Sequence, residues 1–283
     1  MTLSTTLRPA GVRVRRSALD YGLQKKESGS IIVKYSATWI LLCLAYTGPV
    51  FAQSDEIQVY DANIAAVGAF NLTVHNNFTP RGRDTAAFHG GIVPDGSLNG
   101  VLEWAYAAAA WAEAGLYLPL YSLTSDGALV YNGMKFRALF VTPNAADRGF
   151  FYGVNFEFSF NTRHWDERTY TTEIRPIVGI HIGRFDMIFN PILDNSWNGF
   201  SKLKFVPATR LAMMLSARYK VALEEYDDFG SISHFLPASA QAHQLFGVID
   251  MNTPWVAIEA GIGAGLTHAS DQWVLKLILT KDL

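Results

Sequence analysis

The stretch Val154-Asn155-Phe156-Glu157-Phe158-Ser159-Phe160-Asn161 alternates apolar and polar side chains at every position. Successive side chains of a β-strand point to opposite faces. The stretch therefore predicts a strand with a Val/Phe/Phe/Phe face and an Asn/Glu/Ser/Asn face. The segment 256–266 has the same pattern, with Val, Ile, Ala and Leu on one side and mainly Gly on the other.

Similar alternation recurs along the chain and predicts twelve strands, each about ten residues long. We expect them at 60–76, 97–107, 111–122, 128–142, 150–161, 171–182, 184–194, 203–215, 218–227, 242–251, 255–266 and 271–282. The predicted fold class is all-β.

The connections between these segments alternate in length. The links at 77–96, 162–170 and 228–241 are long and rich in charge, Gly and Pro, whereas several of the others are only a few residues. An even number of strands with short turns at one end and longer loops at the other is typical of outer-membrane barrels. We therefore predict a closed antiparallel transmembrane β-barrel of about 12 strands in the cell outer membrane, with short periplasmic turns and longer extracellular loops.

A soluble β-sandwich or lipocalin-like barrel would show the same alternation with its apolar face inward. Two features favour the membrane. The polar face carries too many charges for a packed core, and aromatic residues near segment ends predict interfacial girdles. These aromatics are Tyr60, Trp111, Tyr121, Phe150, Trp165, Trp197, Tyr226, Trp255 and Trp273.

If the apolar faces point to lipid, the charged residues of the opposite faces line the lumen. The predicted lumen-lining residues are Glu103, Glu113, Lys135, Arg137, Glu157, Glu173, Arg175, Asp186, Lys204, Arg210, Lys220, Glu224, Asp250, Glu259 and Lys276. Seven are basic and eight acidic, so the favoured interpretation is a salt-bridged interior. The alternative is a polar pathway for a solute, in which balanced signs argue against strong ion selectivity.

Four prolines fall inside the predicted strands: Pro119, Pro176, Pro191 and Pro207. A closed barrel has no free edge, so each proline removes a hydrogen bond from the ladder. Each predicts either a bulge or a misplaced strand end.

The N-terminal region has the composition of a targeting segment. Lys34, the apolar run from Trp39 to Tyr46 and a small-residue site ending at Ala52 predict a signal peptide over 33–52. Residues 1–32 are basic and are interpreted as a start-site extension, with Val33 as the initiator, or as a long n-region. Residues 53–283 are predicted to form the barrel domain. The only cysteine, Cys43, lies in the apolar run and would be removed with it.

Charge and motif content exclude several function classes. Residues 1–52 hold seven of the 23 basic and two of the 25 acidic residues, which leaves 16 and 23 in 53–283. No basic footprint for nucleic acid remains. The sequence has no glycine loop for phosphates and no His-Glu-x-x-His motif, and its seven histidines are scattered. We expect no cofactor, no metal site and no catalytic residue.

The stretch from Glu103 to Pro119 resembles a hairpin of the outer-membrane proteins grouped with the MetA pathway of phenol degradation and with related transporter families. The matching residues are Glu103, Tyr106, Glu113, Gly115, Leu118 and Pro119. The turn 107–110 departs from the family pattern, and the chain ends in Leu283 where members end in Phe. The resemblance implies transport of small solutes, apolar or aromatic compounds among them.

The predicted function is a passive, porin-like channel or transporter that is not an enzyme. The predicted partners are outer-membrane lipid, lipopolysaccharide, the barrel-assembly machinery and a small-molecule solute. The first alternative is a structural or ligand- and lipid-binding barrel with a plugged lumen, for which the charged loops at Arg81, Arg83, Asp84 and 163–168 offer a contact surface. The second is an outer-membrane lipid hydrolase that uses Ser231, Ser233 and His234, although adjacent residues of a strand point to opposite sides.

Overall fold

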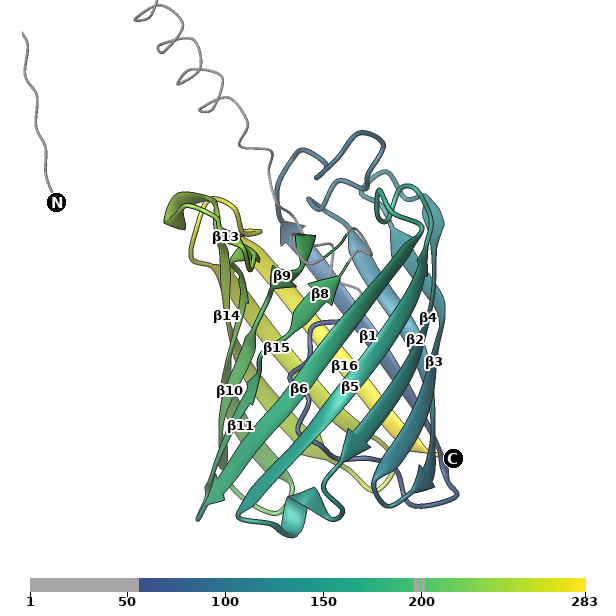
Figure 1. The fold of residues 1–283 in the computed structure, drawn as a ribbon, viewed down its shortest axis with the longest axis vertical. Helices are drawn as coiled ribbons and strands as arrows, with labels where there is room; N and C mark the ends of the chain where they lie inside the picture. Colours follow the sequence, from purple (N-terminus) through teal and green to yellow (C-terminus); the bar gives the residue numbers. More distant parts are fainter. Residues whose placement is uncertain (1–55, 196–198, 200–201) are drawn as a thin grey trace, which may run out of the picture. The chain divides into compact units, whose positions relative to one another are not determined.

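The computed structural model describes residues 56–195, 199 and 202–283. The predicted signal peptide, the extension before it and Trp197 lie outside the described residues. The secondary structure of the described residues consists of β-strands and short turns of 3-10 helix (Figure 1). Among the described residues, no helix is long and apolar enough to cross a membrane.

Twelve strand positions form one closed ring. They are β1 (Phe70–Arg81), β2 (Leu98–Ala109), β3 (Ala112–Leu123), β4 (Leu129–Val141), β5 (Phe150–Asn161), β6 (Tyr170–Ile182), β7 (Phe185–Asn190) with β8 (Leu193–Asn195), β9 (Lys204–Phe205) with β10 (Ala208–Met214), β11 (Tyr219–Asp228), β14 (Ala242–Asn252), β15 (Ala257–Gly265) and β16 (Trp273–Asp282). Neighbours in this order pair antiparallel, and β1 pairs with β16 to close the ring. The predicted fold class is confirmed.

Two short strands extend the wall above β11. These are β12 (Gly230–Ser231) and β13 (His234–Phe235), which form a small hairpin next to β9. Two single turns of 3-10 helix, η1 (Ala145–Asp147) and η3 (Ala238–Ala240), lie in connections. The long connections gather at one end of the barrel and the short turns at the other (Figure 1).

The outer face of the barrel is apolar and the inner face is polar. In β4, Phe136 is 48% exposed and its neighbour Arg137 is 8% exposed. In β5, Phe156 is exposed while Asn155, Glu157 and Ser159 are buried. A soluble barrel would have the opposite arrangement, so the structure favours the membrane over the soluble alternative.

The aromatic residues at strand ends divide into two groups. Trp111, Phe150, Trp255 and Trp273 are exposed on the outer surface, as expected for girdles. The prediction is wrong for Tyr60, Trp165, Tyr121 and Tyr226, which are buried or half-buried. Residue type and closeness to a strand end do not determine which face a side chain takes.

The first predicted strand is placed wrongly. A strand was expected over 60–76, but β1 begins at Phe70, and residues 56–69 enter the barrel without pairing as a strand. Ala62 has a φ of +63°, so the backbone of this segment departs from a regular strand. Gly68, with a φ of +81°, turns the chain into the wall, where its N–H donates to the Ala107 carbonyl at 2.8 Å.

The four strand prolines are accommodated in different ways. Pro176 stays in the ladder opposite Val154. Pro119 lies in a register shift of β3 between Tyr117 and Leu120, which is the expected bulge. Pro191 separates β7 from β8, and Pro207 separates β9 from β10, so each of the predicted strands 184–194 and 203–215 is interrupted.

Gly133 faces the irregular part of β3, and among the described glycines it is the one where an added Cβ would come nearest to backbone atoms. Its φ is +137°, and a Cβ there would lie 2.0 Å from the carbonyl oxygen of Phe160 on β5. We expect Gly133→Ala to lower the free energy of unfolding by more than about 1 kcal/mol. Gly247→Ala on β14 is the matched control, because a Cβ at Gly247 meets no atom within 4 Å. Urea unfolding in detergent micelles measures both, and equal midpoints would contradict the prediction.

Candidate functional site: the barrel lumen

The centre of the lumen holds an N-terminal segment that precedes β1. We call residues 56–66 the luminal segment; in Figure 1 it runs inside the ring of strands toward the start of β1. Ile57, Val59, Tyr60 and Ala62 are buried there, with 7%, 4%, 5% and 3% of their surface exposed. The segment therefore fills part of the lumen that water would otherwise occupy.

Apolar side chains of the luminal segment complete two small cores of the wall. Val59, Tyr60 and Ala62 pack in one cluster with inward residues of β4 to β10, among them Phe151 and Ile177. Ile57 belongs to a second cluster, whose other members are Ala212, Ala222, Phe246, Val248 and Val274. These inward apolar residues explain why the lumen is not uniformly polar.

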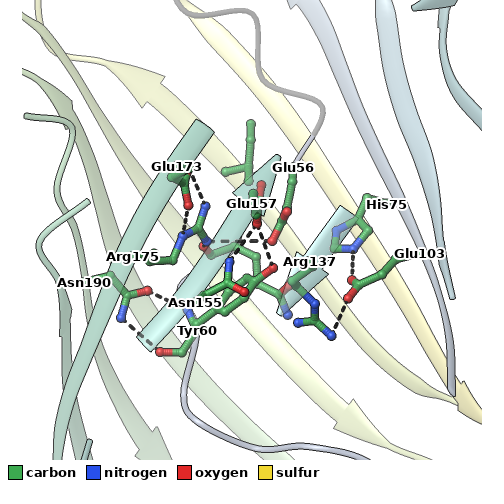
Figure 2. Close-up of polar contacts among 12 residues, drawn as sticks. Glu56, Tyr60, His75, Glu103, Arg137, Asn155, Glu157, Glu173, Arg175 and Asn190 are labelled. Atoms are coloured by element: carbon green, nitrogen blue, oxygen red, sulfur yellow. Dashed lines mark hydrogen bonds and ion pairs between the residues drawn. The ribbon is translucent and has the colours of Figure 1, made fainter. Parts of the chain in front are cut away.

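Wall side chains hold the backbone of the luminal segment. Asn190, at the end of β7, makes two bonds to Tyr60: the Tyr60 N–H donates to Asn190 Oδ1 at 2.7 Å, and Asn190 Nδ2 donates to the Tyr60 carbonyl at 3.0 Å (Figure 2). Arg175 Nη1 on β6 donates to the Gln58 carbonyl at 3.0 Å. This pattern satisfies backbone groups that have no ladder partner.

Two further strands bind the ends of the segment. Lys276 Nζ on β16 donates to the Ile57 carbonyl at 3.3 Å, and the Ala65 N–H donates to Glu113 Oε2 on β3 at 2.9 Å. Anchors from four different strands fix the segment along much of its length.

The Tyr60 ring is the centre of the segment's side-chain contacts. Its hydroxyl lies 2.6 Å from the hydroxyl of Tyr117 and donates to Glu157 Oε1 at 3.4 Å. The guanidinium of Arg175 lies 4.3 Å from the ring centroid and that of Arg137 lies 5.6 Å from it. Tyr60 therefore joins the segment to two charged clusters of the wall.

The first charged cluster joins β1, β2, β3 and β4. His75 Nε2 lies 3.1 Å from Glu103 Oε2, and Arg137 Nη2 lies 2.8 Å from Glu103 Oε1. Arg137 also pairs with Glu113. All four residues are buried, so each charge depends on a partner inside the barrel.

The second charged cluster includes a residue of the luminal segment. Lys135 pairs with Glu157 at 3.3 Å, and Arg175 Nε donates to Glu173 Oε1 at 2.6 Å. Arg175 Nη1 also lies 3.7 Å from the carboxylate of Glu56 (Figure 2). The luminal segment therefore contributes a carboxyl group as well as bulk.

The third charged cluster spans β10, β11, β14, β15 and β16. Lys276 Nζ lies 2.6 Å from Glu259 Oε1, and Arg210 Nη1 lies 3.3 Å from Glu259 Oε2. Glu224 pairs with both Arg210 and Lys276, and Asp250 pairs with Arg210. One guanidinium thus meets three carboxylates, which is the densest group of opposite charges in the described barrel.

Smaller pairs lie toward the two ends. Near the short turns, Asp186 lies 2.7 Å from His181 Nδ1 and 2.8 Å from Lys220 Nζ. At the loop end, Lys204 lies 4.0 Å from Asp228.

The structure places the fifteen residues predicted for the lumen on the inner side of the wall, in these clusters. Their functional role stays a prediction. The sequence did not point to Glu56, His75, Tyr60, Tyr117 or Asn190. Alternation could have placed His75, Tyr117 and Asn190 on the inner face. Each lies an even number of positions from the polar, inward-facing residues of its own strand. Nothing in the pattern could have shown that Glu56 and Tyr60 sit inside a ring formed by later strands.

A cavity of about 220 Å³ remains beside the luminal segment. Its lining includes Tyr60, Glu113 and Arg137, together with Asn71 and Asp282 at the end where β1 begins and β16 ends. The space opens toward the short-turn end, and the luminal segment forms one of its sides.

The residues of the hydrolase alternative lie in the β12–β13 hairpin. The hydroxyls of Ser231 and Ser233 are 2.9 Å apart. The exposed His234 ring makes no hydrogen bond within the part of the chain that the structure describes. A nucleophile and a base need a mutual hydrogen bond and a third group that orients the base, so this geometry does not favour a catalytic triad.

The charged loops pack against their neighbours. Arg83 Nε lies 3.0 Å from Asp271 in the last loop, and Trp165 is only 7% exposed. The Ile92 N–H donates to the His164 carbonyl at 3.2 Å, which joins two loops. Trp165 therefore offers no exposed contact surface, because the loops fold over one another.

A closed barrel with an apolar outer surface, girdle aromatics and an interior of paired charges defines the class: this chain is an outer-membrane β-barrel protein. No protein-family model matches the sequence, and no curated protein matches it. The resemblance to the MetA-pathway families thus stays a prediction.

Three solved structures resemble this chain to different degrees, and one of them reaches a TM-score above 0.5. The COG4313 outer membrane channel from Pseudomonas putida F1 superposes with a TM-score of 0.54 and 12% identity, over 81% of this chain and 100% of that chain. LpxR from Salmonella typhimurium gives a TM-score of 0.42 and 9% identity, over 74% of this chain and 99% of that chain. The outer membrane channel DcaP of Acinetobacter baumannii gives a TM-score of 0.33 and 9% identity, over 76% of this chain and 96% of that chain. At these identities the likeness concerns the fold.

Proposed function

We propose that this protein is an outer-membrane channel for small solutes whose passage is narrowed by the luminal segment. The observation that carries the proposal is the polar, hydrogen-bonded lumen with a cavity of about 220 Å³ beside residues 56–66. A barrel that served only as a structural support would need no such space. The barrel fold shared with a protein described as an outer membrane channel agrees with this proposal.

The charge pattern indicates weak ion selectivity. Basic and acidic side chains are paired with one another in each cluster of the lumen. Paired opposite charges cancel at distances longer than the pair itself, so a permeating ion meets no strong field of one sign. For the solute we propose small neutral molecules, and the resemblance of the Glu103–Pro119 hairpin adds apolar and aromatic compounds to that class.

Single-channel recording of residues 53–283 in a planar lipid bilayer tests the proposal. We expect small, discrete conductance steps and a reversal potential close to zero in a KCl gradient, because the passage is narrow and its charges are paired. Bilayers that receive only the refolding detergent are the control. Stable insertion without any conductance would contradict the channel and would favour the binding or structural barrel with a plugged lumen.

A further inference from the structure

Three potential metal ligands converge on the outer face of the barrel at its loop end. Glu225 and Asp227 are two residues apart in β11, so both point outward, and His243 is the register partner of Asp227 on β14. One ligand atom from each residue lies within 4.8 Å of the others. Among the described residues, this is the one group of three or more such side chains with that geometry.

The group lies just beyond the apolar belt. Leu223 and Leu245, which precede and follow it on the same outward faces, are 54% and 39% exposed. Glu225 is exposed, whereas Asp227 and His243 are half-buried. The three side chains therefore occupy the level where the lipid-facing surface gives way to polar surroundings.

The hydrogen bonds around His243 fix how its ring faces Asp227. Gln241 Nε2 donates to the Leu236 carbonyl at 2.7 Å, which fixes the orientation of the Gln241 amide. Gln241 Oε1 is then an acceptor, 3.3 Å from His243 Nε2. This contact places the proton of a neutral ring on Nε2 and leaves a lone pair on Nδ1.

His243 Nδ1 lies only 2.5 Å from Asp227 Oδ1. A lone pair and a carboxylate oxygen repel one another at that distance unless a positive charge lies close to both. A proton shared by the two atoms fits within this distance, whereas a metal ion would take the place of the proton with the two atoms roughly 3.4 Å apart. The second carboxylate, Glu225, favours a divalent metal ion in that place because it adds a third ligand and a negative charge that one imidazolium does not balance.

We propose that Glu225, Asp227 and His243 form a binding site for a divalent transition-metal ion. One imidazole nitrogen and two carboxylates are a ligand set suited to Zn²⁺, and Gln241 would orient the histidine as a second-shell acceptor does in such sites. Ligands about 2.1 Å from a tetrahedral metal lie roughly 3.4 Å apart, so on binding the Asp227 and His243 ligand atoms move apart from 2.5 Å and the exposed Glu225 moves inward. Solvent supplies the fourth ligand.

The chain offers a matched control inside the barrel. His181 Nδ1 lies 2.7 Å from Asp186 Oδ1, which is the same kind of pair, but Lys220 binds the other oxygen of Asp186. Lys220 supplies the positive charge that the Asp227 pair lacks. His181→Ala therefore removes a His–Asp pair without touching the proposed site.

Isothermal titration of the refolded protein with Zn²⁺ at pH 7 tests the site. We expect one Zn²⁺ per chain, an affinity at least about tenfold weaker in His243→Ala, a loss of about 10- to 100-fold in Gln241→Leu, and no change in His181→Ala. The thermal midpoint should rise with Zn²⁺ in the wild type and stay constant in His243→Ala. Heat-modifiable electrophoretic mobility shows that each variant is folded.

Two results would overturn the proposal. The first is the absence of stoichiometric Zn²⁺ binding, which would leave an imidazolium–carboxylate ion pair as the explanation of the 2.5 Å contact. The second is an unchanged affinity in folded His243→Ala, which would place the bound ion elsewhere.

Discussion

Single-channel conductance is expected to rise severalfold when residues 53–65 are removed, so that the chain begins at Ala66. The deleted part contains nearly all of the luminal segment, and Val59, Tyr60 and Ala62 occupy space between opposite walls of the lumen. Conductance of a narrow pore grows with its free cross-section, and water would fill the vacated volume. The polar groups that bind the segment, such as Arg175 and Asn190, would then be hydrated.

Two point variants separate occlusion from general damage. Asn190→Ala removes both hydrogen bonds to the Tyr60 backbone and should increase the frequency of large openings without changing the barrel. Asp126→Asn, in the exposed β3–β4 loop, should leave the recordings unchanged. An unaltered conductance in the deletion variant would show that the charged clusters, and not residues 56–66, limit the passage.

The largest stability effect is expected from Arg210→Met. Arg210 is buried, with 6% of its surface exposed, and pairs with Glu224, Asp250 and Glu259. Its removal leaves three carboxylates with Lys276 as the remaining cation of the cluster. Loss of one partner from a buried charge group costs about 3–5 kcal/mol. Methionine keeps much of the volume, so the loss would come from charge and not from a cavity.

Urea unfolding followed by tryptophan fluorescence and gel mobility measures this loss. Arg218→Met in the exposed turn between β10 and β11 is the matched control and should stay within about 0.5 kcal/mol of the wild type. The double variant Arg210→Met/Glu224→Gln should regain part of the loss, because one unpaired charge is removed. A single variant as stable as the wild type would mean that water in the lumen solvates these carboxylates.

The positions of most strands could be predicted from the alternation of apolar and polar residues in the sequence. Eleven of the twelve predicted segments lie close to observed strand positions, because a strand with lipid on one side and a polar lumen on the other must alternate at every residue. The exceptions have local causes. Pro191 and Pro207 interrupt two strands where a ladder donor is missing.

The contacts of the luminal site could be predicted from the sequence less well than the strands of the wall. Alternation placed charged residues such as Arg137 and Glu157 on one face, but not the pairs that they form. Those pairs depend on the register between strands, as when Arg137 lies opposite Glu157 yet pairs with Glu113 on the neighbouring strand β3 and with Glu103 two strands away on β2. The Asp227–His243 contact has the same origin, since its two residues are sixteen positions apart in the chain.

The sequence by itself determined that this protein is a closed barrel with a polar side and an apolar side, because period-two alternation is a property of each strand alone. Only the tertiary structure decided what the lumen contains. The sequence places residues 60–69 in the first strand of the wall, but residues 57–62 are enclosed by strands that come later in the chain, and Asn190 and Arg175 bind their backbone. An extended segment packed on both sides and a strand in a wall give the same local pattern, and closure of the ring distinguishes them.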